Sequence, residues 1–392
     1  MIYVDVTGGC LLPLQSGIPR TTRNIFRLLE EHRPGTEPVM WQPFRLGYTR
    51  LSSRARAILD DRFMLPPRAR APRDSTLPFL AACLRELIPP WPAGMPLHRC
   101  MQKRDTLLLT SLFPDNRLEY LSRLCAGPGR RISLFHDAIP LVDPNVPAWE
   151  KQRHLKLLKV LAQMDLVISV SHVSREVLLG LWRENAIAPA PVEVLAVPPH
   201  FNRARPAFTP PSEPANFLYV GRLKQVKNHA NLLAACEILW KENLPFSLTL
   251  IGCEDEAKES AQIIREIRQL QDAGRPVTWR AQVSEDDLHA AYQASCCKAF
   301  ASRHEGFGSP IVESFWHGRP VICSGGGAMG EVSTGPGAVH VEVENVSALA
   351  SAMRILLEDK GRGLTLAKEA YARPVRTWTD YWSELKPLLE AP

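Results

Sequence analysis

The sequence predicts an α/β protein with two doubly wound parallel sheets. Three observations carry this prediction. Short apolar segments alternate with helical periodicity along most of the chain, which is typical of βαβ units. A proline-rich stretch over residues 198–214 divides the pattern into two halves. The length of 392 residues is enough for two ordinary domains, each with its own core.

In the first half, a strand over residues 2–6 leads through a glycine-bearing loop into a helix over 21–31. Many prolines and arginines between 34 and 104 predict short helices and long connections there. Regular alternation then returns. We expect strands over 106–113, 131–135 and 166–170, with helices within 147–164 and after Ser171.

The second half repeats the alternation after six prolines between residues 198 and 214, a density that no helix or central strand tolerates. We therefore predict a Rossmann-like domain over 1–197, a linker over 198–214 and a second Rossmann-like domain over 215–375. Residues 376–392 contain an amphipathic helix that either packs back on the first domain or caps the second. Expected strands are 216–221, 246–251, 277–283, 297–301 and 320–323, with helices over 228–240, 255–273 and 309–317.

Composition excludes several classes of protein. With 45% hydrophobic and 22% charged residues, the chain is neither disordered nor collagen-like. No apolar run is long enough for a membrane span, and the N-terminus opens as a strand without a signal core, so we expect a cytoplasmic protein. Nine scattered cysteines, without metal-ligand spacing, are typical of reduced and mostly buried thiols.

Charge is distributed unevenly along the chain. Residues 20–131 contain 20 Lys and Arg against 10 Asp and Glu, whereas 132–392 contain 27 against 30. The basic region indicates an anionic partner, either a phosphate-bearing acceptor or an anionic membrane face, or it is simply an arginine-rich solvated surface. Nucleic acid is disfavoured because the basic stretch 45–73 lacks aromatic residues at stacking spacing.

Two glutamates mark the sharpest local pattern. Glu305 follows a predicted strand in a glycine-flanked loop, and Glu313 lies seven intervening residues later in the next helix. Strand-to-helix loops of a doubly wound sheet gather at its carboxyl edge, where ligands bind, and carboxylates there accept hydrogen bonds from sugar or ribose hydroxyls. Gly306 and Gly308 allow close backbone approach. By itself, such a pair is also typical of a solvated helix surface.

Two further patterns lie at predicted sheet edges. Arg222 and Lys227 follow the first strand of the second half through Gly221, where two cations beside a helix start can neutralise a pyrophosphate. His136 and Asp137 follow a strand of the first half, so that His136 could donate to a substrate oxygen and Asp137 could orient it or accept a proton. By itself, a His-Asp pair is more often a structural cap than a catalytic element.

Together and in this order, these motifs resemble the family-4 retaining glycosyltransferases of GT-B fold, a group that includes bacterial mannosyl- and rhamnosyltransferases. The resemblance implies two Rossmann-like domains facing a cleft. It also implies transfer of a hexose or deoxyhexose from a nucleotide diphosphate sugar, with GDP-mannose or a related GDP-sugar favoured, to a lipid-linked or oligosaccharide acceptor in surface polysaccharide synthesis. It implies retained anomeric configuration, no cofactor and no metal, with peripheral contact at the inner face of the membrane left open.

The resemblance also implies a role for each residue. Arg222 and Lys227 would hold the donor diphosphate and stabilise the leaving group, and Glu313 would bind ribose hydroxyls. Glu305 would touch the transferred sugar, which His136, with Asp137, would approach from the other domain. Gly17 and Arg20 would border the acceptor or the phosphates. The remaining donor-side residues would be Gly221, Gly306, Phe307, Gly308 and Ser309.

One departure from the family concerns the loop after residues 320–323. The family often has a Pro-Glu pair here, but this chain has Gly330 before Glu331, after a pliable run of glycines at 325–327. The departure leaves the identity of the nucleotide open.

Two alternative functions rest on other observations. A dinucleotide-dependent oxidoreductase would use the same sheets and would need a Gly-x-Gly-x-x-Gly fingerprint after a strand, with an acidic residue about 20 positions on. The glycines at 325, 327 and 330 have this spacing. A non-catalytic, basic peripheral membrane or scaffold protein with a decayed transferase site would use the arginine-rich stretch 45–73 and the apolar segment 77–87.

Overall fold

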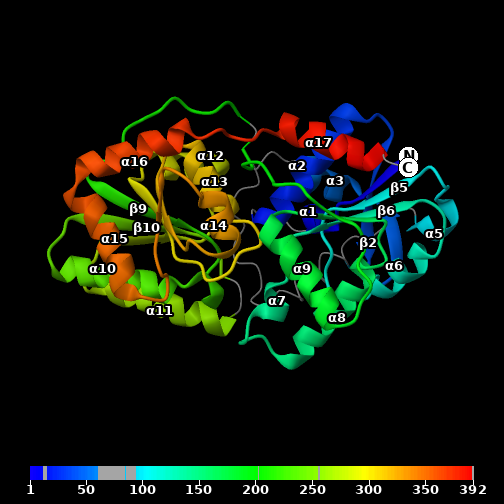
Figure 1. Cartoon of the computed structure of the whole chain (residues 1–392), viewed down its shortest axis with the longest axis horizontal. Helices are drawn as coiled ribbons and strands as arrows, with labels where there is room; N and C mark the ends of the chain where they lie inside the picture. Colours follow the sequence, from blue (N-terminus) through cyan, green and yellow to red (C-terminus); the bar gives the residue numbers. More distant parts are fainter. Residues whose placement is uncertain (12–15, 61–83, 85–93, 202, 255–256, 391–392) are drawn as a thin grey trace. The chain divides into compact units, whose positions relative to one another are not determined.

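The structure is a computed structural model that describes residues 1–11, 16–60, 84, 94–201, 203–254 and 257–390. Within these residues the chain forms two compact units (Figure 1). The first unit contains the described residues up to His200 together with those from Thr377 onward. The second unit contains the described residues from Phe201 to Arg376. Each unit is built around its own sheet.

The first sheet has the strand order β4-β3-β2-β1-β5-β6-β7-β8. From β2 to β8 all neighbouring strands are parallel, whereas β3 is antiparallel to both β2 and β4. The parallel part places the loops after β1, β5 and β6 at one edge. The strands are β1 (Ile2–Asp5), β2 (Thr36–Gln42), β3 (Gly47–Arg50), β4 (Gly94–Met95), β5 (Thr106–Leu109), β6 (Arg130–Phe135), β7 (Leu166–Ser169) and β8 (Val192–Val194).

The prediction of short helices and long connections between 34 and 104 is wrong for residues 36–50, which form a hairpin. Val39, Met40 and Trp41 of β2 are fully buried, so tertiary packing rather than local propensity fixes this segment as a strand. The turn that joins β2 to β3 contains Leu46 with φ at 49°. The many nearby prolines and arginines hide the short apolar run in the sequence.

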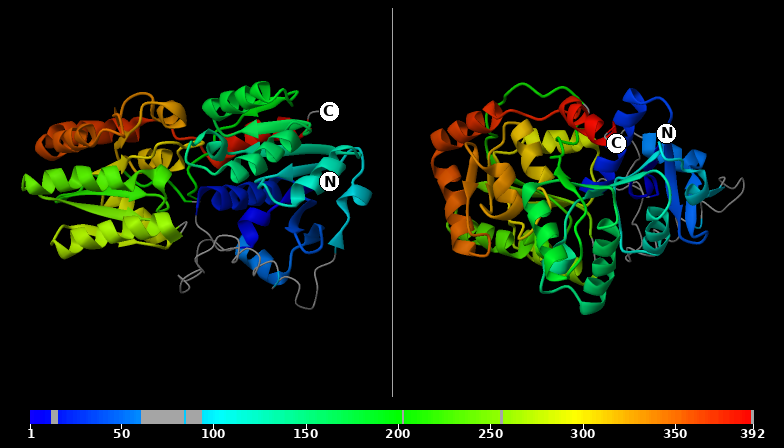
Figure 2. Two further views of the ribbon diagram at one scale, coloured as in Figure 1. Left: turned by 90° about the horizontal axis from the view of Figure 1, so that it is seen from below. Right: turned by 45° about the vertical axis from the view of Figure 1, so that its right-hand side comes forward.

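Helices flank the strands on both sides in each unit (Figure 2). In the first unit the last helix, α17 (Trp378–Glu390), buries Tyr381, Leu385 and Leu389 in the same apolar cluster as Phe26 of α2. The other helices are α1 (Thr7–Cys10), α2 (Gly17–His32), α3 (Ser53–Asp60), α5 (Leu97–Cys100), α6 (Arg117–Cys125), α7 (Ile139–Val142), α8 (Ala148–Leu161) and α9 (His172–Glu184).

The second sheet is parallel throughout, with the order β11-β10-β9-β12-β13-β14. Its central strands, β9 and β12, are therefore covered on both faces, which explains their nearly continuous apolar sequences. The strands are β9 (Ala215–Val220), β10 (Phe246–Ile251), β11 (Val277–Arg280), β12 (Cys297–Phe300), β13 (Val321–Cys323) and β14 (Ala338–His340).

The helices of the second unit pack on both faces of this sheet. Leu232 of α10, Ile267 of α11 and Met353 of α15 share the large core cluster, while Leu288 and Tyr292 of α12 pack with Leu218 in a smaller one. The helices are η1 (Gln225–Lys227), α10 (His229–Lys241), α11 (Ala257–Asp272), α12 (Glu285–Gln293), α13 (Ser309–Trp316), α14 (Gly327–Ser333), α15 (Val346–Glu358) and α16 (Lys360–Ala372).

The stretch that the sequence predicts as a linker, 198–214, has no helix or strand in its described residues. Its later part packs on the second unit. Phe201 is buried and lies 4.9 Å from the ring of Trp316. Arg319, also buried, donates to the carbonyl oxygen of Thr209 at 2.6 Å. The boundary between the two units therefore lies between His200 and Phe201.

Two predictions about membrane contact lie partly outside the described residues. The apolar segment 77–87 is described only at Leu84, and the basic stretch 45–73 only as far as residue 60. In that described part, Arg50 pairs with Glu37, and Arg56 pairs with Glu30 and Asp60. No helix in the described part of the chain is both long and apolar enough to cross a bilayer.

Candidate functional site

The loop after β9 is held close to the loop after β10. The amide of Leu223 donates to the carbonyl oxygen of Cys253 at 2.9 Å. A Cβ atom on Gly252, whose φ is 156°, would stand 1.9 Å from the carbonyl oxygen of Gly221. Glycine is therefore required at 252 because no side chain fits between the two backbones. This packing fixes the backbone at Gly221 and Arg222, with Arg222 half-buried.

Lys227 lies at the end of η1, directly before Asn228 in the left-handed conformation. The Nζ atom of Lys227 is 2.6 Å from Oε1 of Glu305, and the two side chains are 20% and 13% exposed. The structure therefore holds Lys227 in an ion pair. A partly buried pair of this kind is screened less by solvent than a surface pair.

Backbone hydrogen bonds align the two loops that carry this ion pair. The amide of Arg303, in the loop after β12, donates to the carbonyl oxygen of Val226 at 2.8 Å. The guanidinium of Arg303 reaches the carbonyl oxygen of Gln225 at 2.5 Å. The loops after β9 and β12 are therefore joined at the carboxyl edge of the sheet, which brings Lys227 and Glu305 together although 78 residues separate them.

The second glutamate is oriented by its helix. Gly308, with φ at 103°, precedes α13, and Pro310 lies in its first turn. Glu313 lies in the second turn of α13 and is buried, with 2% of the residue exposed. The hydroxyl of Tyr292 donates to its Oε2 at 3.1 Å. Burial of a carboxylate needs such partners, so Glu313 is not the solvated surface residue that the bare sequence pattern also allows.

Lys298 is the residue that sequence reasoning missed. It lies in β12, pairs in register with Leu218 and Val321, and is fully buried. Burial lowers its pKa to about 7, whereas the charges of Glu313 and Glu305 act in the opposite direction. The signal was present in the sequence, because a lysine inside the apolar run 297–301 of a central parallel strand is exceptional.

His136 and Asp137 lie in the first unit at the end of β6. The Nε2 atom of His136 donates to the carbonyl oxygen of Thr110 at 2.8 Å, which leaves Nδ1 as the acceptor of the neutral ring. Burial lowers the pKa of His136. Donation to a substrate oxygen, which the sequence predicts, would therefore require protonation of Nδ1. The Oδ1 atom of Asp137 accepts from the amide of Ile139, the first residue of α7, at 3.0 Å, which is a local structural role.

Gly17 and Arg20 are both in α2. Gly17 is the first residue of the helix. Among the described residues, apart from its chain neighbours and the backbone of its own helix, no atom lies within 4 Å of where its Cβ would be. Arg20 is 5% exposed, and its guanidinium is 3.4 Å from the carbonyl oxygen of His200. Arg20 is therefore buried, whereas the sequence prediction places a cation beside the acceptor or the phosphates.

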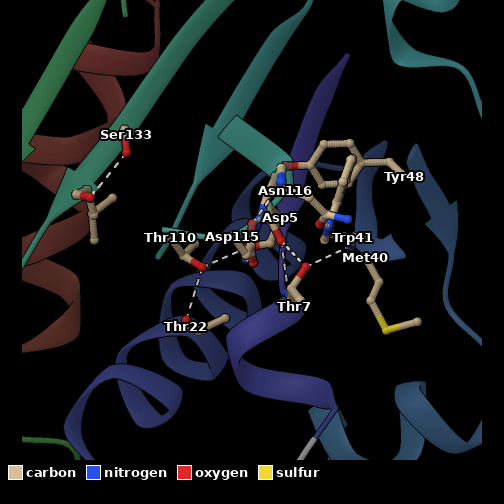
Figure 3. Close-up of polar contacts among 12 residues, drawn as sticks. Asp5, Thr7, Thr22, Met40, Trp41, Tyr48, Thr110, Asp115, Asn116 and Ser133 are labelled. Atoms are coloured by element: carbon tan, nitrogen blue, oxygen red, sulfur yellow. Dashed lines mark hydrogen bonds and ion pairs between the residues drawn. The ribbon is translucent and has the colours of Figure 1, made fainter. Parts of the chain in front are cut away.

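A second polar group at the carboxyl edge of the first sheet was also missed. The Oδ2 atom of Asp5 accepts from Arg117 at 2.5 Å and from the Tyr48 hydroxyl at 2.9 Å, and all three side chains are buried. Figure 3 shows Asp5 within a group of polar residues that includes Thr7, Tyr48, Thr110 and Asp115. Arg117 also pairs with Asp115 at 3.0 Å. Every charge in this group has an opposite partner.

The loop after β13 explains the departure at residue 330. A Cβ atom on Gly330 would stand 2.0 Å from the carbonyl oxygen of Gly325. The backbone around 325–330 is therefore folded too tightly for proline or any other side chain at this position. In the described part of the chain, no group of three or more His, Cys, Asp or Glu residues is arranged to hold a metal ion.

Comparisons with known proteins agree with this architecture. The family model described as "Glycosyl transferases group 1" matches residues 201–373. A serotype-specific mannosyltransferase, WbdA, of Escherichia coli is 27% identical over 241 residues, which are 56% of this chain and 29% of WbdA. The O-antigen chain mannosyltransferase B of Escherichia coli is 26% identical over 270 residues, 61% of this chain and 66% of that protein. This chain thus spans less than a third of the length of WbdA.

Solved structures support the fold prediction. The sucrose-phosphate synthase from Thermosynechococcus elongatus aligns with a TM-score of 0.68 at 18% identity, over 99% of this chain and 97% of that one. TarM aligns with a TM-score of 0.57 at 12% identity, over 74% of this chain and 55% of that one. The predicted GT-B architecture, with two Rossmann-like domains, is confirmed. The family model of the glycosyl transferases group 1 thus covers nearly the whole of the second unit.

Proposed function

We propose that this chain is a retaining, metal-independent glycosyltransferase that uses a nucleotide diphosphate sugar, with GDP-mannose or a related GDP-sugar favoured. The acceptor would be a lipid-linked or oligosaccharide intermediate of surface polysaccharide synthesis. The observation that carries the proposal is the joined pair of loops that holds Lys227 against Glu305 at the carboxyl edge of the second sheet. Similarity to mannosyltransferases of Escherichia coli supports the choice of sugar.

The chemistry of the donor site follows from its charges. Arg222 and Lys227 would bind the diphosphate, and their interaction would strengthen as charge develops on the leaving group. The diphosphate would share the ammonium of Lys227 with Glu305, leaving one carboxylate oxygen of Glu305 to accept from a hydroxyl of the transferred sugar. Glu313, buried and held by Tyr292, would accept from the ribose hydroxyls. Backbone amides of residues 306–309 would line the diphosphate.

His136 in the first unit would act on the transferred sugar. Its ring is fixed by Thr110, so the acceptor atom Nδ1 is the one available to a sugar hydroxyl. Asp137 would then contribute by holding the start of α7 and not by proton transfer.

The test begins with a thermal-shift screen of GDP, UDP, ADP and TDP sugars, because a ligand that binds only the folded protein raises its melting temperature. We expect GDP-mannose to give the largest shift. Sugar transfer is then measured for wild type and for Arg222→Ala and Lys227→Met, with Lys241→Met, an exposed lysine of α10, as the matched control. We expect both site variants to lose about 100-fold in turnover. Unchanged turnover in both would refute the proposal.

A peripheral membrane contact belongs to the same proposal. The basic stretch 45–73 would bind anionic headgroups near the acceptor. Flotation with vesicles containing phosphatidylglycerol should show binding at low salt that is lost at high salt. Absence of binding at low salt would remove the membrane from the proposal and leave the transferase intact.

A further inference from the structure

Lys298 is surrounded by aromatic rings. Its Nζ atom is 5.1 Å from the ring centre of Phe300, 5.5 Å from that of Tyr292 and 5.8 Å from that of Tyr219. The side chain is fully buried, and Nζ has no hydrogen-bond partner among the residues that the structure describes. Aromatic faces attract a cation, but more weakly than the water that burial removes. A buried amine without a partner destabilises the fold, so packing alone does not account for it.

The position of Lys298 connects it to the donor site. β12 continues directly into the loop that carries Glu305, and Glu313 and Glu305 both interact electrostatically with the Lys298 amine. Tyr292, whose ring faces the amine, donates its hydroxyl to Glu313. Tyr219, on the neighbouring strand, donates its hydroxyl to the carbonyl oxygen of Lys227 at 2.8 Å. Two of the three rings around Lys298 are thus hydrogen-bonded to residues of the site.

We propose that Lys298 is a charge-regulating residue of the donor site, a buried amine that takes up a proton when a nucleoside diphosphate binds. The inference rests on the proposed function, since it requires a diphosphate beside Lys227 and Glu305. A bound diphosphate would share the ammonium of Lys227 with Glu305, so the charge of Glu305 would be less neutralised, and it would add negative charge to the edge of the sheet. Both changes favour the ammonium form of Lys298 over the neutral amine.

The titratable groups around the amine determine the direction in which its pKa shifts when a diphosphate binds. Burial disfavours the charged form of the amine, whereas Glu313 on α13 and Glu305 on the loop favour it. Cys297 on the same strand is a neutral thiol near pH 7, because burial raises its pKa well above the usual value. The pKa of Tyr219 is raised by burial and by Glu305, which keeps that hydroxyl neutral near pH 7. Because the pKa of Lys298 is about 7 before binding, an added negative charge raises it through the physiological range. Diphosphate affinity should therefore fall as pH rises above 7.

The experiment measures proton uptake directly. Binding of GDP and of UDP to the full chain is followed by titration calorimetry at pH 7.5 in buffers of different ionisation enthalpy, and affinity is measured from pH 6.5 to 8.5. We expect wild type to take up a fraction of a proton and to bind about tenfold more weakly at pH 8.5 than at 6.5. In Lys298→Met, uptake and pH dependence should both disappear, with a melting temperature equal to or above that of wild type. Lys241→Met should behave as wild type.

The outcomes separate the inference from the proposed function. Binding of GDP or UDP without proton uptake in wild type would overturn the role of Lys298 alone, and the wild-type measurement does not depend on the folding of any variant. Unchanged uptake in Lys298→Met would do the same and would assign the proton to another group. If wild type binds neither nucleotide, the proposed function fails, and the inference fails with it.

Discussion

Both units bury a basic side chain at or near the carboxyl edge of a sheet, but the groups that surround it differ. In the first unit Arg117 is fully buried and contacts Asp5 and Asp115, and its pKa is raised well above its usual value by these two carboxylates. In the second unit Lys298 is equally buried but is enclosed by rings, and burial lowers its pKa. A buried charge with partners is costly to separate from them, whereas a buried amine without a partner can change its protonation when a ligand binds.

The largest expected effect concerns the paired charge. Arg117→Met leaves Asp5 buried without its cation and should destabilise the first unit by about 3–5 kcal/mol. Urea unfolding followed by first-unit tryptophan signals, such as that of the buried Trp41, measures the loss. The control is Arg354→Met, which removes an arginine paired with Glu242 at the surface and should change little. Equal effects in the two variants would contradict the comparison, and so would a destabilisation by Lys298→Met as large as that by Arg117→Met.

The sequence predicted where the strands and loops of these two regions lie, but not which charged side chains pair with each other. Periodicity located the sheets, and the loops that carry Lys227 and Glu305 followed from their position after apolar strands. The ion pair between Asp5 and Arg117 joins residues 112 positions apart, and no local pattern reveals which side chains meet across a sheet edge. The β2–β3 hairpin was missed because its stability comes from burial of Val39 and Trp41 and not from its flanking residues.

The next effect concerns the partly exposed ion pair of the second unit. Glu305→Gln keeps the shape of the side chain but removes the charge that holds Lys227. Because Glu305 competes with a diphosphate for the ammonium, GDP affinity should be equal or higher in this variant, while sugar transfer should fall by about 100-fold. Calorimetry and a transfer assay measure the two quantities separately. A proportional loss of GDP affinity and transfer would show that Glu305 is needed for diphosphate binding itself.

A smaller effect should appear in the pH dependence of stability. Burial lowers the pKa of His229 and of His317 in the second unit to about 3. Between about pH 6.5 and pH 3 the unfolded chain therefore binds protons that the folded unit does not, so stability is complete above pH 6.5 and is lost as pH falls. The slope should approach about 1.4 kcal/mol per pH unit for each histidine. Urea unfolding of wild type and His317→Gln from pH 7 to 4.5 measures it, and the same slope in both would contradict the assignment.

The smallest expected effect concerns Gly17, a position of the first unit that has space for a larger side chain. Gly17 is the first residue of α2, and in the described part of the chain a Cβ atom there would meet nothing within 4 Å beyond its own neighbours and helix backbone. Gly17→Ala should therefore stabilise the first unit by about 0.4–1 kcal/mol, because alanine restricts the unfolded chain. If the backbone at Gly17 approaches an acceptor or a phosphate, the same variant should raise KM for the acceptor while stability increases. A gain in stability with unchanged kinetics would instead show that Gly17 has no role beyond starting its helix. Any binding by the first unit would then come from other loops at that edge of the sheet.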